Sequence, residues 1–567
     1  MAASQKTDIS SLSPKLLEHI FLIATLALYE STEKWQIDMW HARRFLAHHG
    51  NPRDPLVLCS LRQVCKRWDQ IVLSCPELWN YMNSYEHSAA WMQRSLQRSA
   101  GTPLCVAGTS TELAYVVKLC TSEAHRIKSL LFSPVAQTAI ESDPSIAFSA
   151  DFPQLKDFKL ELPCAAGSPW LSLLARAPNL TVLNFVGTSR PSDLLSLAST
   201  LPFTGLKTLA IKGMASSKHL DVDATALLAL LRRLPNLENV LLKGINLIGE
   251  DRATPDTKEI SLPHLRDLQV LFCSTSIFHV LQSIAIPRGT HIDVQLIHVD
   301  PQHSEAFLDF MTRVGAAMHD AGTLRSLQVA LDGLVLRLLG HRSATPENEK
   351  YPDLRVEFWK LDPLGADAGA FLATLMSRAC ARLHLASLRT LTLGADNDRW
   401  EPHALFTGLR PTLAGLAHVQ ELRVEGLLSR LTTAAVADLL TTRHEGRAPL
   451  PALTRVLFDA ADVCAGYHDA FFDALCALLL ARWKLGAPVH RVVVRSEEEE
   501  VFTDAQKMVL RTARTTGMDS HRLVRHFVTE NIPPRAEHAE ALPVEKRTAT
   551  RTRGRLCSCA KTAKGMR

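Results

Sequence analysis

The chain has 567 residues, of which 46% are hydrophobic and 21% are charged, with 26 glycines and 29 prolines. This composition excludes a collagen-like polymer and a wholly disordered chain, because glycine and proline are too few and apolar residues too many. The 63 Lys and Arg and 58 Asp and Glu residues leave a net charge of +5, which argues against nucleic-acid binding by the surface as a whole.

The amino-terminal segment does not resemble a secretory signal, because Met1 to Ser13 are polar. The apolar run 20–28 is shorter than the ~20 residues that a membrane span needs. We therefore expect no membrane partner and a cytoplasmic and/or nuclear location. Most of the twelve cysteines lie in apolar runs, which favours reduced, buried thiols. Cys557 and Cys559 lack partner ligands, so no metal site or cofactor is predicted.

Residues 8–95 are expected to form a small helical domain. Ser13-Pro14 supplies a helix N-cap and a proline at the first helical position, and Asp54-Pro55 repeats this pattern. The second helix should end at Cys75, because the residue before Pro76 disfavours the α conformation. Its apolar residues step by three and four, as an amphipathic helix requires: Leu58, Leu61, Cys65, Trp68 and Val72. Residues of about 25–54 are an insert between the two helices.

These residues, in this order, resemble an F-box. The matching segments are Leu12-Ser13-Pro14, Leu16-Leu17, Ile20-Phe21, Leu61, Val64-Cys65-Lys66-Arg67-Trp68, Ile71 and Pro76-Glu77-Leu78-Trp79. In particular they are similar to the F-box-like domain of a large fungal group that carries leucine-rich repeats behind it. The similarity covers about 70 residues, and the insert 25–54 departs from the family pattern.

The resemblance implies that these helices bind the adaptor subunit of an SCF-type cullin-RING ubiquitin ligase and, through it, the cullin scaffold. The contact would lie on Leu12, Pro14, Leu16, Leu17, Ile20 and Phe21, supported by Leu61, Val64 and Trp68. Taken without the resemblance, the same apolar residues are simply the core of a small helical domain. Both alternatives remain open at the level of sequence.

Residues 101–500 repeat a short apolar motif with the spacing L-x-x-L-x-L. Strong copies begin at Leu155, Leu180, Leu206, Leu237 and Leu265, spaced 25 to 31 residues apart, and weaker copies occur near Ile292, Leu354 and Val492. This is the core pattern of an irregular leucine-rich repeat, whose usual period is ~20–29 residues. Helical stretches are predicted between the strands, at 170–175, 223–234, 304–322, 368–382 and 469–483.

The fold class predicted is therefore α/β, with a helical domain followed by a solenoid of parallel strands on the concave face and helices on the convex face. In each strand the apolar positions turn inward and the alternate ones outward. The outward candidates for binding a protein target are Lys159, Glu161, Asn184, Lys212, Lys243, Gln269, Gln328, Arg423 and Glu425. Their signs are mixed and indicate no charge class, and each is equally compatible with an ordinary solvated position.

A helical cap is expected over 501–530 and a disordered basic tail over 531–567, because 546–567 contain eight Lys and Arg and no acid. The chain lacks P-loop, GxGxxG, HExxH and GxSxG motifs, so no catalytic residue is predicted. The predicted function is a non-catalytic receptor subunit of a ubiquitin ligase that binds an unknown protein substrate. The alternatives are a repeat scaffold unconnected to ubiquitin and, disfavoured by the balanced charge, a nucleic-acid-associated protein that uses the tail.

Overall fold

The computed structural model describes most of the chain between residues 9 and 531. The described residues are 9, 12–31, 55–84, 87–108, 112–132, 134–143, 148–161, 169–187, 204–213, 219–248, 259–297, 300–321, 324–332, 335–343, 352–359, 368–395, 402–425, 430–444, 446–459, 468–496 and 526–531. Most of the predicted insert and the predicted basic tail beyond 531 lie outside them. No helix in the described part has the length and hydropathy needed to cross a bilayer.

The N-terminal helices form a small core of their own. They are α1 (Pro14–Ser31), α3 (Pro55–Val64), α4 (Lys66–Ser74) and the 3-10 turn η2 (Pro76–Trp79). The predicted N-cap is confirmed, since the Leu16 amide donates to Ser13 Oγ at 3.3 Å. The core is built from Leu17, Phe21, Leu58, Ile71, Val72, Cys75, Leu78 and Trp79.

The prediction of one helix from Pro55 to Cys75 is wrong. Cys65 is extended, with φ −162° and ψ 164°, and separates α3 from α4. The break lets both helices turn toward α1, so that Leu58 of α3 and Val72 of α4 enter the same core. Apolar spacing could not predict the break, because the three- and four-residue steps continue across it.

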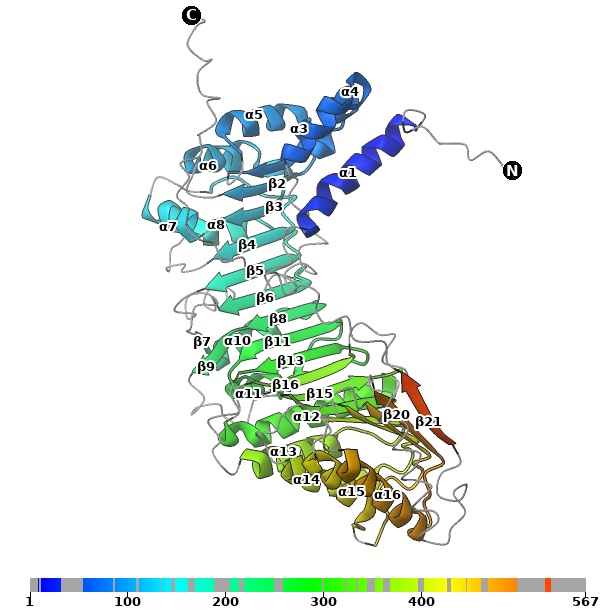
Figure 1. Cartoon of the computed structure of the whole chain (residues 1–567). Helices are drawn as coiled ribbons and strands as arrows, with labels where there is room; N and C mark the ends of the chain where they lie inside the picture. Colours follow the sequence, from blue (N-terminus) through cyan, green and yellow to red (C-terminus); the bar gives the residue numbers. More distant parts are fainter. Residues whose placement is uncertain are drawn as a thin grey trace, which may run out of the picture.

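Seventeen strands of the described chain form one long, curved sheet (Figure 1). They are β1 (Tyr81–Asn83), β2 (Leu104–Gly108), β3 (Ile127–Phe132), β4 (Asp157–Glu161), β5 (Val182–Gly187), β6 (Thr208–Gly213), β8 (Asn239–Lys243), β11 (Asp267–Cys273), β13 (His291–Leu296), β14 (Ser326–Asp332), β15 (Val335–His341), β16 (Leu354–Phe358), β17 (Thr390–Ala395), β18 (Glu421–Glu425), β19 (Arg455–Asp459), β20 (Arg491–Ser496) and β21 (His526–Asn531). Two further parallel pairs are short: β7 (Leu220–Asp223) with β9 (Ile245–Ile248), and β10 (Ile260–Ser261) with β12 (Ile284–Ala285).

Within this sheet, the strands from β1 to β13 pair in chain order and in parallel, and so do those from β17 to β21. Between these two runs the order along the sheet is β13, β16, β15, β14, β17. Strand β15 is antiparallel to both of its neighbours. The sheet is therefore mainly parallel, as predicted, but the antiparallel β15 interrupts it.

The helices that connect the strands follow one side of the sheet (Figure 1). They are α5 (Ala89–Arg98), α6 (Leu113–Ser122), η3 (Ala124–Arg126), α7 (Pro134–Ser142), α8 (Pro169–Ala175), α10 (Ala224–Arg232), η5 (Thr275–Ile277), α11 (Phe278–Leu281), η6 (Pro301–His303), α12 (Ser304–Ala321), α13 (Ala368–Arg382), α14 (Pro402–Gly415), α15 (Arg430–Thr441) and α16 (His468–Lys484). All five predicted helical stretches are confirmed, with ends that differ by at most two residues.

Inward strand residues and helix residues share one continuous core. In β4, Phe158 and Leu160 are fully buried in it, while Lys159 between them points to the opposite face. The chain is therefore a mixed α/β protein in which a large, mainly parallel sheet is covered by helices on one side.

The predicted helical cap at 501–530 is corrected at its carboxyl end. Residues His526–Asn531 form β21, which pairs in parallel with β20 and extends the sheet beyond residue 500. Residues 501–525 lie outside the described chain. The alternating His-Phe-Val-Thr-Glu pattern is that of a strand, and pairing with the edge of β20 provides its hydrogen-bond partners.

Candidate functional site

Two surfaces are candidates for binding other proteins: the exposed side of the N-terminal helices and the outward face of the sheet. No group of His, Cys, Asp and Glu residues in the described chain is arranged to hold a metal ion.

The N-terminal helices bury part of the predicted adaptor contact. Leu17 and Phe21 are fully buried, and the Phe21 ring lies 4.8 Å from that of the half-buried Trp68. Their assignment as residues free to contact an adaptor is therefore corrected: they hold α1 against α3 and α4. Leu12, Ile20 and Leu61 are half-buried at the edge of the same core.

A neighbouring stripe of α1 is exposed instead. Leu16 and Ile23 are exposed large apolar residues, and Ile20 lies between them at helical spacing. Pro14 is also exposed, at the first turn. Val64, at the end of α3, is the most exposed of the large apolar residues in the described chain. Together Leu16, Ile20, Ile23 and Val64 are called the α1 surface.

One polar contact brings the two parts of the α1 surface to the same end of the helices. The Arg67 guanidinium, at the start of α4, donates to the Leu12 carbonyl oxygen, just before α1. This places the α3–α4 turn, with Val64, beside the first turn of α1, with Leu16. Side chains of α1 beyond residue 24 lie outside the described residues.

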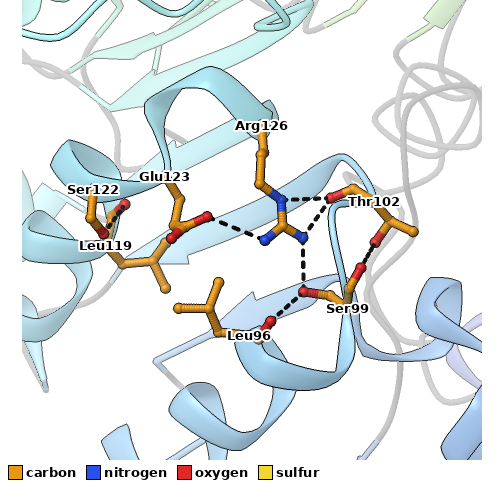
Figure 2. Close-up of polar contacts among 7 residues, drawn as sticks. All are labelled: Leu96, Ser99, Thr102, Leu119, Ser122, Glu123 and Arg126. Atoms are coloured by element: carbon orange, nitrogen blue, oxygen red, sulfur yellow. Dashed lines mark hydrogen bonds and ion pairs between the residues drawn. The ribbon is translucent and has the colours of Figure 1, made fainter.

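The helical core is joined to the sheet by buried polar contacts. Trp79 Nε1 donates to the Val72 carbonyl oxygen at 2.8 Å, and the Arg98 guanidinium of α5 lies 4.5 Å from the centre of the Trp79 ring. Figure 2 shows the next contact: Arg126 donates to the Thr102 carbonyl, Ser99 Oγ and Glu123. One guanidinium thus links the end of α5 to η3, at the start of the sheet.

Strand register orders the predicted substrate residues into rows across the outward face. Lys159 and Asn184 are direct neighbours, and so are Lys212 and Lys243. Gln328 and Arg423 lie in the same row across the sheet, with one strand, β17, between them. The structure therefore places these candidates on one face of the sheet, although its length separates the first from the last.

Several of the same candidates are already engaged within the chain. Asn184 and Gln269 are buried, and Gln269 Nε2 donates to Asp267 at 2.9 Å. Gln328 donates to Glu425 at 3.1 Å, and Arg423 donates to Glu421 at 2.7 Å. The Glu161 side chain lies outside the described residues. Lys159, Lys212 and Lys243 are partly exposed.

Of the residues that meet at the centre of this face, sequence analysis named only Lys243. Lys243 lies 5.7 Å above the ring of Phe272, and that ring meets Trp359 edge-on at 5.9 Å. Trp359 Nε1 donates to Glu357 at 3.2 Å. Glu357 also pairs with Arg355 at 3.0 Å and with Arg337 at 3.3 Å. Arg355 also lies 3.8 Å from Asp293. The name central cluster is used below for Lys243, Phe272, Asp293, Arg337, Arg355, Glu357 and Trp359.

The weaker motif copies near Ile292 and Leu354 contained part of this information. Asp293, Arg355 and Glu357 are among the outward positions of those two strands, and the same alternation rule selects them. Arg337 was not found in this way, because the sequence analysis identified no copy of the motif in β15. No protein-family model matches the chain, and no curated protein matches it either.

Proposed function

We propose that the chain is the substrate-recognition subunit of an SCF-type cullin-RING ubiquitin ligase. In this proposal the N-terminal helices are an F-box-like domain that binds the adaptor, and the strand–helix units are degenerate leucine-rich repeats of a solenoid that binds a protein target. The observation that carries the proposal is a separate helical core that leaves the apolar α1 surface exposed, joined to a long sheet whose outward face carries charged side chains such as Lys159, Lys212 and Lys243. Exposed apolar residues at helical spacing are typical anchors for a partner groove.

The proposed mechanism is positioning rather than catalysis. The chain would hold a target beside the ubiquitin-charged enzyme of the ligase and so raise the effective concentration of its lysines. A fixed distance between the two surfaces favours this role. The contacts of Arg98 with Trp79 and of Arg126 with Ser99, Thr102 and Glu123 supply that rigidity.

Co-purification with the ligase adaptor tests the proposal. Leu16→Asp combined with Val64→Asp should weaken adaptor binding by about 2 kcal/mol or more, roughly thirtyfold, because charges replace apolar anchors. Gln93→Asp combined with Gln97→Asp is the matched control, since it adds the same two charges at exposed positions of α5, outside the α1 surface. Leu17 and Phe21 are unsuitable targets, because a buried aspartate would unfold the helices.

An adaptor interaction that survives the Leu16 and Val64 changes would remove the α1 surface from the proposal. A wild-type chain that does not bind the adaptor would favour the second candidate, a repeat scaffold unconnected to ubiquitin. The burial of Leu17 and Phe21 favours that candidate, because two of the residues implied by the F-box resemblance serve the internal core.

A further inference from the structure

We propose that the central cluster binds an acidic segment of the target protein that also carries an apolar or aromatic side chain. The inference rests on the proposed receptor role of the sheet and specifies the chemistry of the target. It derives from three features of the cluster: its layered charges, its rigid aromatic pair and its place at the interruption of the parallel strands.

The charges of the cluster are arranged in two layers. The carboxylates lie beneath, where the side chain of Glu357 is 2% exposed and that of Asp293 is 8% exposed. The guanidinium groups lie above them, with the side chains of Arg337 and Arg355 32% and 33% exposed. A partner therefore meets the guanidinium groups first, although the charges of the two arginines and the two carboxylates sum to zero. Guanidinium groups form bidentate hydrogen bonds with carboxylates, so this surface complements an acidic segment.

The aromatic pair is held in place before any partner arrives. Phe272 has φ +54°, which is rare for a bulky residue, at a register shift between Leu271 and Cys273. Such a conformation persists only where the surroundings impose it, and these positions cluster at binding sites. The buried Glu357 accepts from Trp359 and pairs with both arginines, so one carboxylate orients three side chains. Pre-oriented tryptophan and arginine side chains are typical of residues that dominate binding energy.

The interruption of the sheet explains why these groups meet here. Arg337 comes from the antiparallel β15, whose pairing places it directly beside Glu357 of β16. An unbroken repeat would have put the next parallel strand in this position. Residues 546–567 of the same chain do not suit the cluster, because they carry eight basic residues and no acid.

Binding of short synthetic peptides to the purified full-length chain tests the inference. One peptide set combines Asp and Glu with Leu and Trp, and the matched set replaces the acids with Lys. The acidic set should bind, and Lys243→Glu and Trp359→Ala should each weaken its binding about tenfold or more. Lys484→Glu makes the same charge change at the exposed end of α16 and should bind like wild type. Circular dichroism confirms that each variant is folded.

Equal binding of the acidic and basic sets, absence of binding to the acidic set, or acidic binding that survives both cluster variants would overturn the inference. A single-stranded RNA probe that displaces the acidic peptides and shows the same sensitivity to Lys243→Glu would also overturn it in favour of a nucleic-acid site. The assay contains no adaptor, so its outcome is independent of the adaptor experiment and separates failure of this inference from failure of the ligase role.

Discussion

Asp157 lies at the start of β4 on the outward face of the sheet, where Ser129 of β3 donates to its carboxylate at 3.3 Å. Burial raises the pKa of Asp157 to about 6, although this hydrogen bond and the nearby Lys159 oppose the shift. A carboxyl group whose folded pKa lies above its unfolded value binds its proton more tightly in the folded state. Its contribution to stability is therefore present at low pH and is lost as the pH rises from about 4 to about 6.

Replacement of Asp157 by Asn should remove this pH dependence. The amide keeps a hydrogen-bond acceptor for Ser129 but has no charge to bury, so at pH 7 the variant should be more stable than wild type by about 1–2 kcal/mol. Chemical denaturation at several pH values between 4 and 7 measures the effect. Asp151→Asn is the control, because Asp151 is an exposed carboxylate paired with Arg176 at 3.3 Å. Identical pH profiles for wild type and Asp157→Asn would contradict the assignment.

At the scale of elements, the helices α13 and α14 pack closely through a glycine. A Cβ atom added at Gly408 of α14 would clash with the Cβ atom of Ala373 and lie 2.9 Å from its carbonyl carbon, in α13. Gly415, at the end of the same helix, has nothing within 4 Å of the corresponding position. Gly408 is therefore tightly packed against the neighbouring helix, whereas Gly415 of the same helix is not.

Gly408→Ala should destabilise the chain by about 1–3 kcal/mol, because the cost of overpacking exceeds the ~1 kcal/mol gain in helix propensity. Gly415→Ala changes only the helix propensity at that position, so it should be neutral or slightly stabilising. Thermal unfolding of both variants measures the difference. Equal unfolding midpoints would show that α13 and α14 are farther apart in solution than the structure places them.

For the whole molecule, β21 protects the edge of a very apolar strand. Val492, Val493 and Val494 of β20 are fully buried, and β21 pairs with β20 along its entire length. An uncovered strand of this kind offers unpaired backbone groups to a second chain. The sheet is therefore complete only when residues 526–531 are present.

Two truncations separate the role of β21 from that of the residues behind it. Deletion of 524–567 removes the strand and should cause self-association, detected as a larger mass in light scattering after size-exclusion chromatography. Deletion of 544–567 leaves β21 in place. This product should keep the oligomeric state of the full chain and its adaptor binding. A monomeric product from the longer deletion would show that β20 needs no cover.

The sequence by itself determined the alternation of strands and helices and most of their positions. Both the motif at Leu155 to Leu265 and the proline-marked starts of α1 and α3 are local patterns, and their periods follow from the geometry of a single strand or helix. Local periodicity also selected outward positions such as Lys243. It could not rank these positions by solvent exposure, because exposure depends on neighbours from other strands.

Only the tertiary structure decided which apolar stripe of α1 is exposed and where the parallel order of the strands is interrupted. It also decided that the guanidinium groups of the central cluster are more exposed than its carboxylates. Leu16 and Leu17 are equally apolar neighbours, yet packing against α3 and α4 buries Leu17 and leaves Leu16 exposed. Arg337 meets Glu357 only because β15 enters the sheet in reverse. These outcomes depend on contacts between elements distant in the chain, which no local period encodes.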